Sequence, residues 1–173
     1  MTDAAAECLP PEVEQLLLDV VADGFTVYCC GSKAAPTALV AVYEWPQCID
    51  LITIRNFDRI AAARVPRRGN VDIFAPEIVL WAYEGPPQWT LRVLLKLVHP
   101  RHPDAPHGEF PAPPYLRIRR AEQRPMTIRL PSPGRAGARA RRLATTMAAD
   151  NRSKGSLSLS ATHTTPPASY SDS

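Results

Sequence analysis

Long apolar runs are missing from this sequence. No stretch approaches the roughly 18 uninterrupted apolar residues that a membrane-spanning helix needs. The N-terminal stretch, MTDAAAECLPPEVEQ, carries acidic side chains where a signal or transit peptide would carry basic ones. We therefore expect a cytoplasmic protein that makes no use of a membrane.

The motifs of the common enzyme classes are missing as well. The sequence contains no GxSxG nucleophile elbow, no P-loop, no GxGxxG turn and no DxDxDG calcium loop. The cysteines are few, and they lack the CxxC spacing of redox and zinc sites. We interpret Cys8, Cys29, Cys30 and Cys48 as small apolar residues of a reduced protein, and we expect no cofactor.

Lysine is scarce, whereas arginine is abundant and unevenly placed. Seventeen of the twenty basic residues are arginines. Residues 1–24 hold six acids and no base, residues 25–131 have a net charge of +5, and residues 132–173 have a net charge of +4. The sequence pI of 8.8 is lower than that of domains that bind nucleic acid through charge alone. The chain is therefore dipolar rather than strongly basic.

Hydrophobic periodicity predicts one α+β domain over residues 1–131. Apolar residues repeat at helical spacing in 9–24 and 86–100, and each segment starts with a proline pair. Connections of two to four residues between the first strands favour antiparallel pairing, so we expect a mainly antiparallel sheet of about six to seven strands with two packed helices. The expected strands are 25–30, 37–45, 48–56, 59–65, 77–83, 115–120 and 126–130, the last two as an edge hairpin.

Two further segments follow the predicted domain. Residues 132–149 carry a thin apolar stripe beside several arginines, with Ser132 placed to cap a helix and Pro133 in its first turn. We predict a basic amphipathic helix there. Residues 150–173 are rich in serine and threonine, a composition typical of a disordered tail.

The proline-rich stretch HPRHPDAPH, residues 99–107, is the first candidate site. Its three histidines, His99, His102 and His107, belong to a residue type that binds zinc. Three interleaved prolines hold the stretch extended, and it lacks the HExxH spacing of a helical zinc site. We interpret it as a solvated loop and expect no metal; if the chain did hold one, these histidines are the candidates.

A cluster of acids and arginines is the second candidate. Asp50, Arg55 and Asp58 lie around the end of one predicted strand. Two carboxylates within about 5–10 Å of each other can act as general acid and base, which defines an alternative hypothesis, an enzyme of unknown reaction. The simpler interpretation is a turn in which arginines pair locally with acids. We favour the turn over catalysis.

An arginine-rich surface is the third candidate and carries the leading hypothesis. Alternation along the predicted hairpin places arginines and one tyrosine on a single polar face, and more arginines follow in the C-terminal helix. Such a surface can hold phosphates and stack a base. We predict a non-catalytic binding or regulatory module that contacts an acidic partner, either a protein or a nucleic acid. The expected contact residues are Tyr115, Arg117, Arg119, Arg129, Arg135, Arg139 and Arg142.

An internal arrangement competes with that hypothesis. The acidic N-terminal helix and the basic C-terminal helix could dock on each other, and the docked arginines would then be neutralised within the chain. The sequence leaves open which of the two arrangements holds. It also leaves the oligomeric state open.

Two stretches carry a resemblance to other proteins. They are FDRIAAARVPRRGNVDIFAPEIVLWAYEGPPQWTLRVLLKLVHPRHPDAP and RAEQRPMTIRLPSPGRAGARA. Together they resemble small uncharacterised proteins of actinobacteria with GC-rich genomes, over residues 25–147. The resemblance implies no activity, fold or ligand, so it assigns no site.

Overall fold

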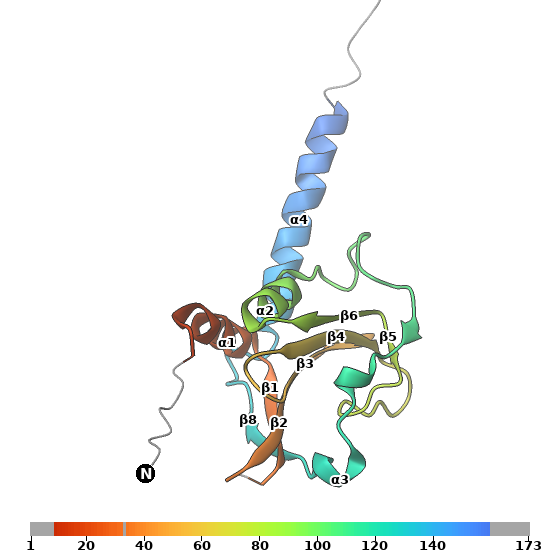
Figure 1. Cartoon of the computed structure of the whole chain (residues 1–173). Helices are drawn as coiled ribbons and strands as arrows, with labels where there is room; N and C mark the ends of the chain where they lie inside the picture. Colours follow the sequence, from red (N-terminus) through yellow and green to blue (C-terminus); the bar gives the residue numbers. More distant parts are fainter. Residues whose placement is uncertain (1–8, 33, 160–173) are drawn as a thin grey trace, which may run out of the picture.

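A computed structural model describes residues 9–32 and 34–159, and it confirms the α+β class (Figure 1). Its centre is a six-stranded antiparallel sheet in the order β6-β4-β3-β2-β1-β8, beside a small sheet of two strands, β5 and β7. The strands are β1 (Thr26–Gly31), β2 (Pro36–Glu44), β3 (Cys48–Ile54), β4 (Ile60–Pro66), β5 (Ile78–Val79), β6 (Trp81–Gly85), β7 (Phe110–Pro111) and β8 (Met126–Arg129).

Apolar residues on both faces place β2, β3 and β4 in the interior of the sheet. Every residue of β3 is buried, and so is every residue of β4 except its last. Successive side chains point to opposite faces, so Ile52 and Ile54 join one hydrophobic cluster while Ile49 and Leu51 join another. The sequence predicted these three strands to within two residues at either end.

Two helices pack on the sheet, as predicted, and both lie on the same face. Each helix begins at a proline, where the missing N–H costs no hydrogen bond. Their inward residues Val13, Val20, Leu91 and Leu94 pack with Ile52 of β3 in one cluster. The helices of the chain are α1 (Pro11–Asp23), α2 (Pro87–Lys96), α3 (Arg120–Gln123) and α4 (Ala138–Leu159), with a 3-10 turn, η1 (Pro114–Leu116).

Loops and short turns cover the other face. Leu116 and Ile118 are buried there against the second cluster, and the backbone N–H of Ile118 donates to the carbonyl of Phe74. The predicted hairpin of 115–120 with 126–130 is therefore wrong. Alternate apolar residues in 115–120 do face the core, but they pack under a loop, and β8 pairs with β1 instead.

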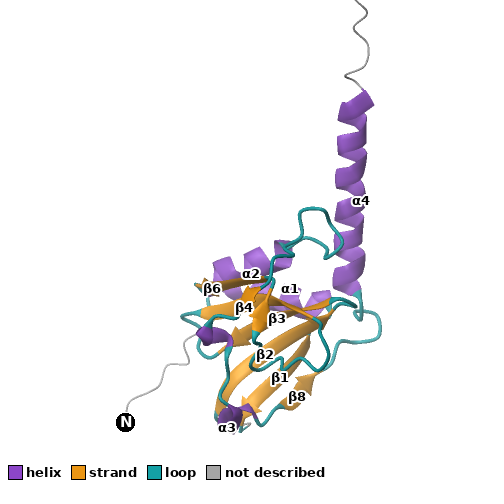
Figure 2. Cartoon of the chain, turned by 90° about the vertical axis from the view of Figure 1, so that its right-hand side faces the viewer, coloured by secondary structure: helices purple, strands orange, loops and turns teal. Residues whose placement is uncertain are grey.

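The C-terminal helix starts later and ends later than predicted. Residues 132–137 form a turn, and Gly137 has a φ of 75°, which a right-handed helix does not accommodate. α4 then runs from Ala138 to Leu159, so residues 150–159 of the predicted tail are helical, and 160–173 lie outside the described residues. Figure 2 shows α4 leading away from the body of the protein.

Gly24 ends α1 in a conformation that only glycine adopts easily. Its φ is 94°, and a Cβ built there would lie 2.3 Å from the carbonyl oxygen of Arg135. We expect Gly24→Ala to lower the free energy of unfolding by about 1–3 kcal/mol, because backbone strain and a clash with the segment before α4 add together. Urea unfolding measures the loss. Gly155→Ala is the control, since a Cβ there meets no atom within 4 Å, and an equal loss in both variants would contradict the prediction.

Candidate functional site

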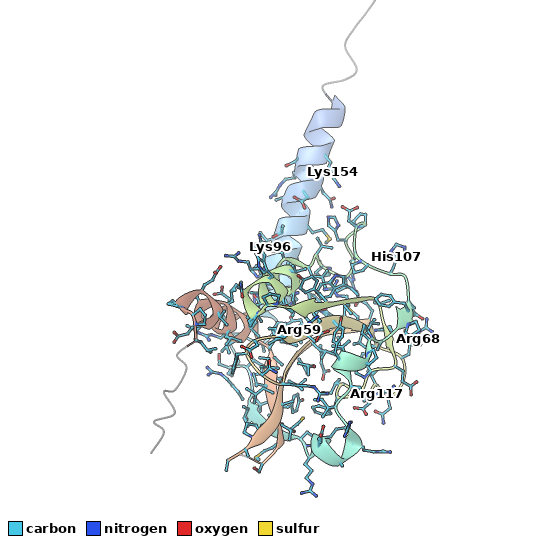
Figure 3. All side chains as sticks on the ribbon, viewed as in Figure 1. Arg59, Arg68, Lys96, His107, Arg117 and Lys154 are labelled. Carbon is cyan, nitrogen blue, oxygen red and sulfur yellow. The ribbon has the colours of Figure 1, made fainter. Side chains whose placement is uncertain are left out.

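A cleft of about 490 Å³ lies on the loop-covered side of the sheet, where the turn between β3 and β4 meets the segment after η1. Two segments distant in sequence supply its arginines and its tyrosine. Arg55 and Arg59 come from the turn, whereas Tyr115, Arg117 and Arg119 come from the segment that follows β7 (Arg59 and Arg117 are labelled in Figure 3). We call this the arginine cleft.

Local hydrogen bonds shape the turn that carries Arg55 and Arg59. The side-chain Oδ1 of Asn56 accepts from the backbone N–H of Asp58 at 3.2 Å and from that of Arg59 at 3.1 Å. Asparagine is favoured in turns because its side chain can accept hydrogen bonds from the backbone a few residues further along the chain. The Arg55 guanidinium donates to the backbone carbonyl of Arg117 and so joins the two walls of the cleft.

Positive charge dominates the arginine cleft. Glu84 is the single carboxylate in its lining, and the Arg59 Nε lies 3.1 Å from its Oε1. Among the described residues, Arg55, Arg117 and Arg119 form no ion pair with a carboxylate. Three guanidinium groups therefore remain able to bind an anion.

An unsatisfied hydroxyl lies in the same lining. The Thr53 side chain is 3 % exposed, and its Oγ1 has no hydrogen-bond partner among the described residues. A buried polar group without a partner costs about 1–3 kcal/mol, and Oγ1 is itself buried beneath the surface of the cleft. Burial, helped by the charge of Glu84, raises the pKa of Tyr115, so its phenol is uncharged at neutral pH and does not repel an anion.

A second cleft of about 600 Å³ adjoins the first and shares Arg117 and Arg119 with it. Arg68 and Arg120 add positive charge, while Asp72 and Glu77 add negative charge. Arg68 is ion-paired with Glu109 at 2.5 Å. The two shared arginines thus lie where an elongated ligand would pass from one cleft to the other.

The arginines predicted as one surface do not form one. Arg129 lines a cavity on the helix-covered face, and Arg135 is exposed in the turn before α4. Arg139 has no exposed surface, so it cannot contact a partner, and Arg142 is bonded to Asp23. Only Tyr115, Arg117 and Arg119 of the predicted set come together in the arginine cleft.

The predicted cluster of acids and arginines is also divided. Asp50 is fully buried among the core residues under the helices, whereas Arg55 and Asp58 are exposed in the turn at the far end of β3. Asp50 and Arg55 are therefore not placed to act on one substrate. Arg55 instead lies beside Arg117. The sequence analysis placed Arg55 in the candidate catalytic cluster and Arg117 in the candidate binding surface, and the structure brings the two residues together.

Asp50 belongs to a buried ionic network that ties α4 to the sheet. Its carboxylate accepts from Arg64 Nε at 2.6 Å, from Trp45 Nε1 at 2.9 Å and from Arg139 Nε at 3.0 Å. Arg139 also donates to Asp23 at 3.1 Å. Burial alone would raise the pKa of Asp50, but the hydrogen bonds and charges of the two arginines outweigh it and hold the pKa below its usual value.

The sequence contains a signal for part of this network. Asp50 is the one charged residue within the apolar strand β3, and Arg64 is the one charged residue within β4. The two are direct partners in the antiparallel register. A lone acid and a lone base in neighbouring apolar strands are a signal of a cross-strand pair, because an unpaired buried charge is costly.

Within residues 9–32 and 34–159, the acidic helix α1 bonds to the basic helix α4 through one carboxylate. Asp23, the last residue of α1, accepts from Arg139 and Arg142 of α4, with Arg142 Nε at 2.9 Å. Glu12 pairs instead with Arg92 of α2. The internal arrangement thus accounts for two of the predicted contact arginines.

The histidines and cysteines do not form a metal-binding cluster in the described part of the chain. Within residues 9–32 and 34–159, no three His, Cys, Asp or Glu side chains gather as metal ligands do. His102 is buried and accepts from the backbone N–H of Asp104. Cys29, Cys30 and Cys48 are buried and carry no disulfide, while Cys8 lies outside the described residues. Burial, with the nearby charge of Asp50, raises the pKa of Cys48 to about 12, so its thiol stays protonated.

Comparison with known proteins identifies no relative. Neither a protein-family model, nor a curated protein, nor a solved structure matches the chain. Of the helices within residues 9–32 and 34–159, none combines the length and the apolar character needed to cross a membrane.

Proposed function

We propose that the chain is a non-catalytic binding module that holds an acidic, phosphate-bearing partner in the arginine cleft. One observation carries the proposal. Arg55, Arg117 and Arg119, which form no ion pair with a carboxylate in the described chain, line one cleft together. Three positive charges are thus available to one anion.

Arginine is well suited to bind phosphate, as it is to bind a carboxylate. Its planar guanidinium presents parallel N–H donors that match two phosphate oxygens. Tyr115 adds a partly exposed aromatic ring beside these donors, and such a ring can stack a base. The adjoining cleft extends the path through the shared Arg117 and Arg119, which suits a single-stranded nucleic acid better than a small ion.

The lining also supports binding rather than catalysis. It contains no histidine and no cysteine, and its carboxylate, Glu84, is held by Arg59. General acid–base chemistry needs a group that can exchange a proton with the substrate near neutral pH. The residues around the arginine cleft are suited instead to holding charge and excluding water.

Salt-dependent binding tests the proposal. We expect a labelled mixed-sequence single strand of DNA or RNA to bind the full chain, with log K falling linearly in log[salt]. Substituting Arg117→Gln together with Arg119→Gln should reduce the slope by about 1.4, because each lost phosphate contact on a single strand removes about 0.7. Fluorescence anisotropy at four salt concentrations measures both the affinity and the slope.

The matched control removes the same charge elsewhere. Arg101 and Arg152 are exposed and unpaired among the described residues, so Arg101→Gln with Arg152→Gln should leave the slope nearly unchanged. Equal losses in the two double variants would show diffuse charge attraction and reject the cleft. If DNA and RNA fail to bind but a poly-glutamate peptide binds and depends on Arg117 and Arg119, the acidic partner is a protein and the phosphate assignment is wrong.

A further inference from the structure

A cavity of about 230 Å³ lies on the helix-covered face, between α1, the sheet and β8. Side chains from five elements and the turn after β3 line it, and nearly all of them are apolar. Val21 and Leu17 come from α1, Ile52 from β3, and Ile128 from β8. The space is open to solvent on one side, so it is an apolar hollow beside the helix and not an enclosed void of the core.

The rim of the cavity is open and apolar. Phe57 is 41 % exposed and Ile128 is 45 % exposed, and both line the opening. Exposed apolar side chains gathered around a hollow mark a ligand site more often than scattered ones do. An apolar group can therefore enter from solvent without rearranging the sheet.

One charged residue meets this apolar lining. Arg129 of β8 belongs to the lining, and its side chain makes no ion pair or hydrogen bond among the described residues. Its positive charge complements a negative group held at the cavity. The rest of the lining would exclude such a group, because burying an unpaired charge in apolar surroundings is costly.

We propose that this cavity binds a monocarboxylic acid whose apolar chain fills the space under α1 and whose carboxylate contacts Arg129. The size of the cavity limits the chain. A dry cavity of about 150 Å³ holds benzene, so the present one accommodates a chain of about eight carbons. The cavity is too small for a helix of a partner protein. It lies on the opposite side of the sheet from the arginine cleft and does not depend on that proposed function.

Octanoate is the probe that tests the site in the full chain. Isothermal titration calorimetry should show binding, with affinity rising about fourfold for each methylene from hexanoate to octanoate, since burial of a methylene contributes about 0.8 kcal/mol. Octanol, which has the same chain without the charge, should bind at least tenfold more weakly. Arg129→Gln should remove most of that difference between octanoate and octanol.

Two variants block the cavity by different routes. Val21→Trp fills it from α1, and Ile128→Trp covers it from the exposed edge strand, where a larger side chain does not disturb the fold. Each folded variant should lose octanoate binding by more than tenfold. Leu18→Trp is the control, because Leu18 is 55 % exposed on the same helix and does not belong to the lining.

Three results would overturn the proposal. The first is no binding of octanoate by the wild-type chain at millimolar concentration. The second is undiminished binding in Ile128→Trp, which would place octanoate elsewhere. The third is an octanoate preference over octanol that survives Arg129→Gln, which would remove Arg129 from the site.

Discussion

Replacing Arg139 by leucine is expected to lower the free energy of unfolding by about 3–5 kcal/mol, since it removes one member of a buried ionic network. The Arg139 side chain has no exposed surface and donates to Asp50 at 3.0 Å, to Asp23 at 3.1 Å and to the backbone carbonyl of Leu94 at 2.8 Å. Leucine satisfies none of these acceptors. Asp50 keeps Arg64 and Asp23 keeps Arg142, but each buried carboxylate loses one hydrogen-bonding cation. The Leu94 carbonyl keeps the backbone N–H of Leu97 and loses the guanidinium.

Urea unfolding at neutral pH measures the effect of this substitution. Arg152→Leu is the matched control, because Arg152 lies on the same helix and is exposed. We expect that control to change stability by no more than about 0.5 kcal/mol. A loss of under 1 kcal/mol in Arg139→Leu would mean that α4 is not held to the body by this network. Arg139→Lys should recover only part of the loss, because one ammonium cannot reach all three acceptors.

Asp50→Asn is expected to destabilise the protein by about 3–5 kcal/mol at neutral pH, and the loss should shrink in acid. The asparagine removes the carboxylate that pairs with Arg64, and it leaves Arg139 with Asp23, which Arg142 also contacts. The wild-type contribution depends on pH because Asp50 has a lower pKa in the folded state than in the unfolded state. Ionised Asp50 therefore stabilises the fold above the unfolded pKa of about 4.

The pH dependence of the free energy of unfolding tests whether Asp50 is the titrating group. As the pH falls below about 4 towards the folded pKa, the stabilisation from ionised Asp50 is progressively lost. The difference in unfolding free energy between wild type and Asp50→Asn should therefore be largest near pH 7 and smaller at pH 3. Asp58→Asn, at an exposed position of the turn after β3, should show no comparable narrowing. A constant difference across this range would rule out Asp50 as the titrating group.

Local pattern was sufficient for most of the elements. The helical spacing in α1 and α2, and the apolar runs of β2, β3 and β4, are properties of short segments, and each formed within two residues of its expected position or, in α2, within four. The strand predicted over residues 115–120 is wrong. Leu116 and Ile118 alternate with polar residues as in a strand, but the neighbouring prolines favour an irregular backbone. Which segment pairs with β1 depends on the packing of the whole sheet.

The candidate sites were harder to predict than the elements. The sequence showed that arginines are plentiful, and it singled out Tyr115, Arg117 and Arg119, which do line the arginine cleft. It could not distinguish these residues from Arg139, which has the same side chain and lies wholly inside the protein. The role of an arginine depends on whether a carboxylate lies within a few ångströms in the folded chain.

The sequence by itself determined the fold class, the two helices that pack on the sheet, and the uneven charge along the chain. Those properties follow from nearest-neighbour spacing and composition, which folding does not alter. Only the tertiary structure decided that Arg139 and Asp50 neutralise each other while Arg55 and Arg117 remain together beside Thr53. The reason is distance: Asp50 lies 89 positions from Arg139 and Arg55 lies 62 positions from Arg117, so their contacts exist only once the sheet, the loops and α4 have packed.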